Sequence, residues 1–372
     1  MLKVDGVELR RVSMPLKGPF ETSFGVQYER DLILVRVLTA GGEGWGECVA
    51  MAAPTYSSEF NDAVMLVMRD FLLPLLARPS GIDAAGFTEA AAPVKGHRMA
   101  KAAVEMALLD AQLRQSGLSF AEYLGATRSH VPAGVSVGIA PDIDSLLRTV
   151  GVFIEQGYVR IKLKIKPGWD LEPVRQVRRE FGDDLLLQVD ANAAYALSDA
   201  RLLSRLDEFG LLLIEQPLGE EDLTEHAALA RILQTPICLD ESITSAKAAA
   251  DALRLGACSV VNIKAGRVGG YLEARRIHDV CAAQGVPVWC GGMIETGIGR
   301  AANMALAALP GFTLPGDTSA SDRFYEQDIT EPLVIQDGQI EVPTGPGTGI
   351  AIRHEVLSQV TRSTEWISLT GG

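Results

Sequence analysis

The sequence lacks the features that would place it in a membrane or outside the cell. No stretch approaches the roughly 18 apolar residues of a membrane span, and the apolar run from Leu72 to Leu76 is interrupted by Pro74. The five cysteines are scattered without a C-x-x-C pair, which is typical of buried reduced thiols and not of a disulfide framework or a zinc knuckle. The opening residues alternate polar and apolar side chains and contain no secretory h-region. We therefore expect a cytoplasmic chain with no membrane partner.

Positive charge is also in deficit, with 34 Lys and Arg against 47 Asp and Glu and a net charge of −13. A phosphate backbone would repel such a chain unless one face were strongly basic, so nucleic acid is not expected as a partner. Apolar residues, in contrast, make up 47% of the 372 residues. A chain of this length and composition can bury a substantial core, which excludes disorder as its main description.

The residue pattern changes twice along the chain. Residues 1–50 carry short alternating or β-branched runs between glycines, which predict an antiparallel meander. Residues 57–125 are rich in Ala and Leu at helical spacing, most clearly from Met99 to Leu113. We therefore expect an α+β capping domain over residues 1–128, completed by residues 323–372, where short strands and turns return.

Residues 129–322 repeat a short apolar run, a polar or glycine break and an amphipathic stretch. This repeat predicts eight strands, at residues 133–137, 160–165, 185–189, 211–215, 237–239, 259–263, 286–290 and 312–314. Five successive runs are each closed by a charged residue, and these residues follow one another at intervals of 24–26 positions, the length of one βα unit. They are Lys164, Asp190, Glu215, Asp240 and Lys264. The expected fold is α/β, a (β/α)7β TIM-type barrel with the α+β capping domain, and its strand ends gather on one face.

Three of these strand ends are carboxylates, namely Asp190, Glu215 and Asp240. A single Asp at such a place is often a helix N-cap. Three at one unit's spacing, each after an apolar strand, favour a metal site. Because the ligands are oxygen atoms, we expect Mg²⁺, with Mn²⁺ able to substitute, and no zinc.

Lysines flank this acidic arc. Lys162 and Lys164 are two apart on one strand, so both point into the barrel mouth, and Lys264 faces it from the other side. Neighbouring ammonium groups and a divalent metal disfavour the charged form of a lysine, which predicts lowered pKa values and a usable base. Two lysines across a metal suit removal of a proton next to a carboxylate, with the metal taking the charge that develops on the carboxylate oxygens.

The sequence around these positions resembles the enolase superfamily over essentially the whole chain, in its muconate-lactonizing-like branch. Within that branch it is similar to the group of o-succinylbenzoate synthases and N-succinylamino acid (N-acylamino acid) racemases. The motifs that carry the resemblance are Lys162-Leu163-Lys164, Asp190-Ala191-Asn192, Ile214-Glu215-Gln216-Pro217, Leu239-Asp240-Glu241-Ser242, Asn262-Ile263-Lys264, Gly291 to Arg300 and Leu314 to Ala320.

The resemblance implies an Mg²⁺-dependent enzyme that abstracts an α-proton from a succinyl-bearing carboxylate and needs no organic cofactor. The reaction would be the dehydration of menaquinone biosynthesis, racemisation of N-succinylamino acids, or both. Lys164 would be the base, Lys264 the lysine of the opposite face and Lys162 a stabiliser of the enolate. Asp190, Glu215 and Asp240 would be the metal ligands. A homo-oligomer is expected.

Several further residues are candidates for substrate binding, namely Ser136, Asn192, Gly292, Met293, Arg267, Thr22 and Tyr56. Gly292, which precedes Met293, either allows an anion to approach the backbone N–H groups or allows tight packing at the end of the barrel. Arg267 either tunes Lys264 or binds a loop carbonyl. Residues 20–25 and 55–56 are candidates for a lid, which would exclude water from the intermediate.

Four alternatives stay open at this point. Dipeptide epimerase and muconate cycloisomerase belong to the same superfamily. A metal-free Schiff-base aldolase would also use a lysine at a strand end, but it gives no reason for three carboxylates. A binding protein without activity would have the fold, since fold alone does not establish catalysis, yet all five chemical side chains are present.

Overall fold

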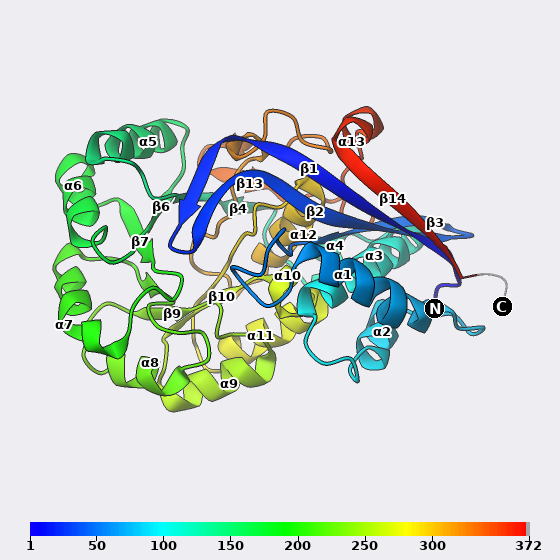
Figure 1. Ribbon diagram of the computed structural model, residues 1–372, viewed down its shortest axis with the longest axis horizontal. Helices are drawn as coiled ribbons and strands as arrows, with labels where there is room; N and C mark the ends of the chain where they lie inside the picture. Colours follow the sequence, from blue (N-terminus) through cyan, green and yellow to red (C-terminus); the bar gives the residue numbers. More distant parts are fainter. Residues whose placement is uncertain (370–372) are drawn as a thin grey trace.

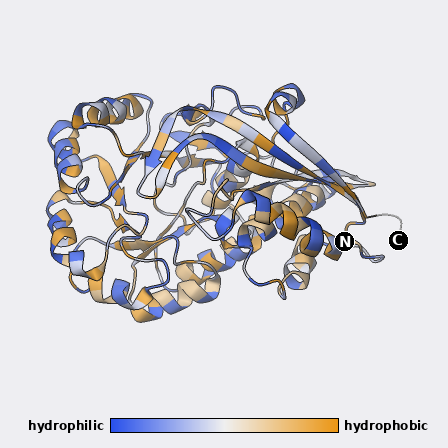
Figure 2. Cartoon of the chain, in the orientation of Figure 1, coloured by the Kyte–Doolittle hydropathy of each residue, from blue (hydrophilic) through white to orange (hydrophobic). Residues whose placement is uncertain are grey.

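A computed structural model of the chain describes residues 1–369. Four antiparallel strands form the sheet of the cap in the order β14-β1-β2-β3. Their bounds are β1 Val4–Thr22, β2 Gly25–Thr39, β3 Gly42–Cys48 and β14 Thr361–Ser368. Hydrophobic and hydrophilic residues alternate along β1 and β2, as expected for strands with one face on a core (Figure 2). The predicted meander is therefore confirmed for β1, β2 and β3.

Helix α3, Arg98–Ser116, covers this sheet at very close range. A Cβ atom on Gly46 would lie 2.0 Å from the carbonyl oxygen of Ala103, and one on Gly44 would lie 2.2 Å from that of Ala107. Glycine on β3 therefore allows the helix backbone to lie directly on the strand. The other helical segments of this part of the chain are α1 Asn61–Val67, the π-helical turn η1 Met68–Leu72, the 3-10 turn η2 Leu73–Leu76, α2 Ala84–Ala90 and α4 Phe120–Leu124.

A second sheet of seven parallel strands, in the order β11-β10-β9-β8-β7-β6-β5, curls inside a ring of helices (Figure 1). The strands are β5 Gly134–Val137, β6 Arg160–Lys164, β7 Leu186–Asp190, β8 Ile214–Glu215, β9 Ile237–Leu239, β10 Val260–Ile263 and β11 Val288–Cys290. The helices are α5 Ile143–Glu155, α6 Leu171–Phe181, α7 Ala200–Leu203, α8 Leu223–Leu229, α9 Ala246–Leu255, α10 Ala265–Val268, α11 Tyr271–Ala283 and α12 Gly297–Ala307, with 3-10 turns η3 Leu197–Asp199 and η4 Ser204–Phe209.

Helix α5 shows how these helices arise from the sequence. The side chain of Asp142 caps its N-terminus by accepting a hydrogen bond from the Ser145 amide at 2.7 Å. Its buried residues Leu146, Val150 and Phe153 recur every three or four positions, so they form one apolar face against the sheet.

The eighth predicted strand, at residues 312–314, is not present as a strand. Residues 312–317 lie between the two ends of the curled sheet: the Asp317 amide donates to the Cys290 carbonyl of β11, and Gly316 forms an isolated parallel bridge with Ala133, just before β5. Pro315 has no N–H to donate, so the segment cannot continue a regular ladder. The prediction of a mixed α/β barrel with an α+β cap holds, with an irregular segment in the eighth place.

The C-terminal part of the chain joins both halves. Strand β13, Gln339–Glu341, pairs with β12, Ile335–Gln336, and with β4, His130–Pro132, in a small antiparallel sheet. The 3-10 turn η5, Ser321–Arg323, precedes this sheet, and helix α13, His354–Val360, leads into β14. The domain boundaries at residues 128 and 323 stay predictions of the sequence.

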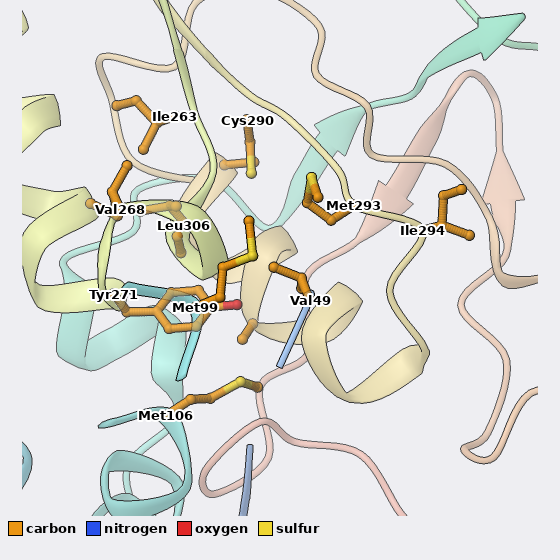
Figure 3. Close-up of a cluster of buried hydrophobic side chains, with 14 of the residues drawn as sticks. Val49, Met99, Met106, Ile263, Val268, Tyr271, Cys290, Met293, Ile294 and Leu306 are labelled. Carbon is orange, nitrogen blue, oxygen red and sulfur yellow. The ribbon is translucent and has the colours of Figure 1, made fainter. Parts of the chain in front are cut away.

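Apolar side chains from both halves meet in one core (Figure 3). Val49, Met99 and Met106 come from the cap, and they lie near Tyr271 and Leu306 of the barrel helices. All five cysteines are free and buried, as the sequence predicts. Within residues 1–369, no helix is long and apolar enough to cross a membrane.

Candidate active site

The predicted strand-end residues lie side by side because the strands are parallel and in register. Lys164 on β6 is opposite Asp190 on β7, and Asp190 is opposite Glu215 on β8. Asp240 directly follows β9, and Lys264 directly follows β10. All five side chains are buried. Parallel strands thus bring these groups to one rim of the sheet, as the sequence predicts.

Each lysine donates to a carboxylate of the predicted metal set. The Lys164 Nζ lies 2.6 Å from Asp190 Oδ2, and the Lys264 Nζ lies 2.7 Å from Asp240 Oδ2. The Lys162 Nζ lies 3.0 Å from Glu215 Oε2 and 3.3 Å from Asp190 Oδ2. The acidic arc and the lysines therefore form one buried network of alternating charge.

This network shifts the pKa values of its members, and the carboxylates act on two of the lysines in the direction opposite to that predicted for neighbouring ammonium groups and a metal ion. Burial alone would lower the pKa of Lys162, but the carboxylates of Asp317 and Glu215 outweigh burial and raise it above the ordinary value. The pKa of Lys264 is raised in the same way, mainly by Asp240. Each ammonium group contacts a carboxylate, and this attraction stabilises its charged form, so the lowering of the lysine pKa beside a bound metal ion stays a prediction.

The carboxylates respond in opposite directions. Burial would raise the pKa of Asp190, but Lys164 and Lys162 hold it well below the ordinary value. Burial and the nearby Asp190 charge raise the pKa of Glu215. Burial and repulsion from the nearby carboxylates therefore disfavour the charged form of Glu215, and an added cation would favour it.

Tyr56 and Arg267 surround Asp240 and Lys264. The Lys264 Nζ donates to the Tyr56 hydroxyl at 3.1 Å and lies 5.1 Å from the centre of its ring. The Arg267 Nη2 lies 2.9 Å from Asp240 Oδ1, and its Nη1 donates to the Ile243 carbonyl at 2.6 Å. Arg267 therefore binds a loop carbonyl, as one of the two interpretations has it, and it shares the Asp240 carboxylate with Lys264. The tuning of Lys264 by Arg267 stays a prediction.

Two family descriptions match most of this chain. "Mandelate racemase / muconate lactonizing enzyme, N-terminal domain" matches residues 5–125, and "Enolase C-terminal domain-like" matches residues 146–356. The chain belongs to the enolase superfamily. The resemblance inferred from the motifs is confirmed.

Named relatives within the superfamily are similar over nearly their whole length. An N-succinylamino acid racemase of an Amycolatopsis species is 66% identical, with 98% of this chain and 100% of that protein covered. An o-succinylbenzoate synthase of Geobacillus kaustophilus is 48% identical, with 99% and 98% covered. The crystal structure of an enolase-superfamily member from Listeria innocua superposes with a TM-score of 0.95 at 40% identity, with both chains fully covered.

Enolase-superfamily sites combine a lysine or histidine base with Mg²⁺, and the donor set here fits such an ion. Asp190, Glu215 and Asp240 offer only oxygen atoms, all fully buried, and Asp190 and Glu215 already share one cationic partner in Lys162. Across residues 1–369, no three His, Cys, Asp or Glu side chains converge into a ready-made metal site. In this arrangement the carboxylates contact lysines instead.

Two charged residues of the superfamily site received no role from the sequence. Asp317 Oδ2 accepts a hydrogen bond from Lys162 at 2.6 Å, and Asp317 Oδ1 accepts one from Arg160 at 2.9 Å. The Arg160 guanidinium is fully buried and lies 5.3 Å from the centre of the Trp289 ring. Asp317 lies three residues beyond the eighth predicted run, so the rule that located the strand-end carboxylates did not reach it.

The amide of Asn192 connects two charged groups at the rim. Its Oδ1 accepts from Lys164 at 2.7 Å, and its Nδ2 donates to Glu241 Oε1 at 2.9 Å. The other predicted polar residue of the rim, Ser136, is buried in the cavity wall, and its hydroxyl has no partner among the described residues. A ligand in the cavity can therefore bind the Ser136 hydroxyl without breaking an existing bond.

A cavity opens onto the three lysines. Its lining consists of Phe20, Gly134, Ser136, Lys162, Lys164, Lys264, Gly292, Ile294, Glu295, Arg300, Asp317, Ser319 and Phe324. Gly292 lines it as predicted. Met293 does not appear among these lining residues; its side chain is buried in the core of Figure 3, and the next residue, Ile294, lines the cavity instead.

The tip of the β1–β2 hairpin closes over the barrel mouth at three loops. The Glu21 carbonyl accepts from the Ile139 amide at 2.9 Å, and the Glu21 carboxylate accepts from Lys166 at 2.9 Å. The Ser23 hydroxyl donates to the Asn192 carbonyl at 3.2 Å. The predicted candidate Thr22 donates its hydroxyl to the Gly25 carbonyl at 3.2 Å, so it shapes the hairpin turn.

Proposed function

We propose that this chain abstracts the α-proton of a succinyl-bearing carboxylate, acting as an o-succinylbenzoate synthase, an N-succinylamino acid racemase or both. One observation carries the proposal. Lys164 and Lys264 line the same cavity from β6 and from the end of β10, and β7, β8 and β9 with their carboxylates lie between them. A substrate carbon in that cavity would have one lysine on each side, which removes a proton as the neutral amine or returns one as the ammonium group.

Asp190, Glu215 and Asp240 would hold a Mg²⁺ ion, and Mn²⁺ would substitute. The bound ion supplies positive charge for the substrate carboxylate as the α-proton leaves. The chain's own residues do the rest. Lys164 removes the proton, Lys162 contributes charge beside the same carboxylate, and the hairpin tip excludes water.

The two reactions share the first step and differ in the second. In racemisation, the lysine of the opposite face returns a proton, so Lys164 and Lys264 exchange roles between the two enantiomers. In dehydration, only Lys164 moves protons: it removes the α-proton and then donates it to the departing hydroxyl, while Lys264 supplies positive charge. The relatives carry both names, so we include both reactions in the proposal. We also expect the enzyme to work as a homo-oligomer in the cytoplasm.

The test is proton exchange in D₂O. Wild-type enzyme with Mg²⁺ and either enantiomer of an N-succinylamino acid should lose the α-proton signal in the NMR spectrum and form the other enantiomer. Conversion of the hydroxylated cyclohexadiene substrate to o-succinylbenzoate, followed by absorbance, measures dehydration. Absence of exchange with both enantiomers together with absence of dehydration would contradict the proposed function.

A further inference from the structure

The loop between β11 and α12 contains a strained residue at the cavity wall. Ile294 has a φ angle of +58°, in the left-handed region. A β-branched side chain is a genuine outlier there, because its two γ-carbons crowd the backbone. Such a conformation persists only when the surroundings fix it, and it is most often found at functional sites.

Hydrogen bonds on both sides hold this residue. The Met293 amide donates to Glu295 Oε2 at 2.8 Å, which fixes the residue before it. The Tyr325 hydroxyl donates to the Ile294 carbonyl at 2.7 Å. Arg300 Nη2 donates to the Glu295 carbonyl at 2.9 Å, which fixes the residue after it. We call residues 293–296 the clamped turn.

The cap supplies the last constraint through Glu47 on β3. Glu47 Oε1 accepts from the Thr296 amide at 3.0 Å. Glu47 Oε2 accepts from the Thr296 hydroxyl at 2.6 Å and from the Gly299 amide at 3.0 Å. A fully buried carboxylate with three donors is a rigid anchor, and here it attaches the end of the clamped turn to the other half of the molecule.

The conformation matters because it decides where the Ile294 side chain lies. In the left-handed conformation this side chain lines the cavity together with Phe20 and Phe324. Among the described residues, neither Glu47 nor Tyr325 belongs to the cavity lining. These two residues therefore do not line the space that a substrate would occupy, and both bind the turn that does.

We propose that Glu47 and Tyr325 are positioning residues that hold Ile294 in its strained conformation and thereby set which substrate tails the cavity accepts. The proposal rests on the proposed function for its substrates. It gives the cap a part in specificity beyond that of a lid, since Glu47 binds the end of the clamped turn from β3 and not from the hairpin tip.

The strain itself is tested by comparing Ile294→Gly with Ile294→Ala in thermal unfolding. At an ordinary φ angle alanine is the more stable of the two, because glycine loses more chain entropy on folding. At φ +58° the order should reverse, with the glycine variant unfolding about 1–3 °C higher. Ala320→Gly, at φ −62°, provides the control and should unfold lower than wild type. A higher unfolding temperature for Ile294→Ala than for Ile294→Gly would show that the backbone at residue 294 is not strained.

Specificity is tested with Tyr325→Phe and Glu47→Gln. The measured quantity is the ratio of kcat/KM for N-succinylphenylalanine to that for N-succinylalanine. We expect each variant to change this ratio at least tenfold. Tyr195→Phe is the matched control, because it also removes a buried hydroxyl, one that donates to Asp170 Oδ2 at 3.2 Å away from the turn. Its ratio should stay within twofold of wild type. Folded variants with an unchanged ratio, or an equal change in Tyr195→Phe, would overturn the proposal.

A readout without turnover separates this proposal from the proposed function. Hydrogen exchange of the peptide that contains residues 293–299 should be at least tenfold faster in Tyr325→Phe and Glu47→Gln than in wild type, and unchanged in Tyr195→Phe. If the wild-type enzyme turns over neither substrate class, the proposed function is contradicted. The rate of backbone hydrogen exchange still shows whether Glu47 and Tyr325 hold the turn. Unchanged exchange in both variants would overturn their role.

Discussion

The carboxylate of Glu105, on cap helix α3, accepts a hydrogen bond at 2.9 Å from the amide of Leu272, in the first turn of barrel helix α11. Its other oxygen accepts from the Tyr271 amide at 3.1 Å. A side chain of one half of the molecule thus caps a helix of the other half. The Glu105 side chain is fully buried, so this contact connects the docking of the two halves to the ionisation of one group.

The first prediction concerns pH. Burial raises the pKa of Glu105 to about 7, from an ordinary value of 4.5. Between these values the folded protein binds more protons than the unfolded chain, so the contribution of Glu105 to stability falls as pH rises from 4.5 to 7. The free energy of unfolding of wild type minus that of Glu105→Gln should decline over this window, by at most about 1.4 kcal/mol per pH unit. It should level off above pH 7.

Urea unfolding at several pH values measures this difference. Glu47 titrates in the same range, with its pKa also raised to about 7 by burial. Subtraction of the Glu105→Gln curve cancels that contribution, because Glu47 is present in both proteins. A difference that is flat from pH 4.5 to 8 would show that Glu105 keeps an ordinary pKa.

The second prediction concerns the metal. Chelation with EDTA should abolish turnover, and Mg²⁺ or Mn²⁺ should restore it. Asp240→Asn should weaken Mg²⁺ binding, measured by calorimetry, by more than the roughly 10–100-fold typical for loss of an outer-shell partner. Asp251→Asn, at an ion pair on the surface of α9, should bind Mg²⁺ like wild type. Full activity in metal-free buffer would contradict a metal-dependent mechanism.

The third prediction separates the two faces of the substrate. Lys164→Arg and Lys264→Arg should each lose racemisation, since that reaction needs both lysines. Each should retain exchange in D₂O of the one enantiomer whose proton faces the remaining lysine. Lys164→Ala should lower dehydration by at least ~10²–10⁴-fold, the usual contribution of a general base.

Lys247→Arg is the control for these lysine variants, because the Lys247 side chain is exposed on α9 and contacts only Asp251 among the ion pairs of the described residues. Its rates should match those of wild type. Near-wild-type dehydration by Lys164→Ala would contradict the assignment of Lys164 as the base. Free α-proton exchange of both enantiomers in the Lys264 variant would contradict the assignment of the two lysines to opposite faces of the substrate.

The fourth prediction concerns the close contact of β3 with α3. Gly46→Ala would place its Cβ 2.0 Å from a backbone oxygen, so the helix must move away from the sheet, at a cost of about 1–3 kcal/mol or more. Gly18→Ala meets no atom within 4 Å, and its change should stay within about 0.5 kcal/mol. Urea unfolding of both variants compares the two costs. Equal stability would mean that the sheet and helix are loosely packed.

The charged part of the site could be predicted because lysine and carboxylate residues are conspicuous at the ends of apolar strands. Lys164 and Asp240 stand out for that reason. Cavity residues such as Ile294 and Phe324 could not be predicted in the same way, since an apolar side chain in a loop is equally typical of a core. The left-handed φ of Ile294 depends on contacts with distant residues, and no local pattern encodes it.

The strands also divide into those that the sequence predicts and those that it does not. Strands β5 to β11 each carry a short apolar run of their own, so they were predictable. Strand β14 was not predicted, because residues 361–368 are mostly polar and only their pairing with β1 makes them a strand. Short strands were predicted within residues 323–372, yet of the apolar run at residues 331–335 only Ile335 belongs to a strand, since Pro332 cannot donate to a ladder.

The pairing of β14 with β1 delays the completion of the cap sheet until residues 361–368 have been synthesised. Val12 and Thr361 are partners in the sheet, so the ribosome makes the whole barrel before it makes the strand that covers the outer edge of β1. At a synthesis rate of 5–20 residues per second, that interval is roughly 20–70 s. During this time the nascent cap exposes an unpaired β-edge that a neighbouring nascent chain can join. The synthesis of β14 therefore ends the period in which this edge of β1 is open to a strand of another growing chain.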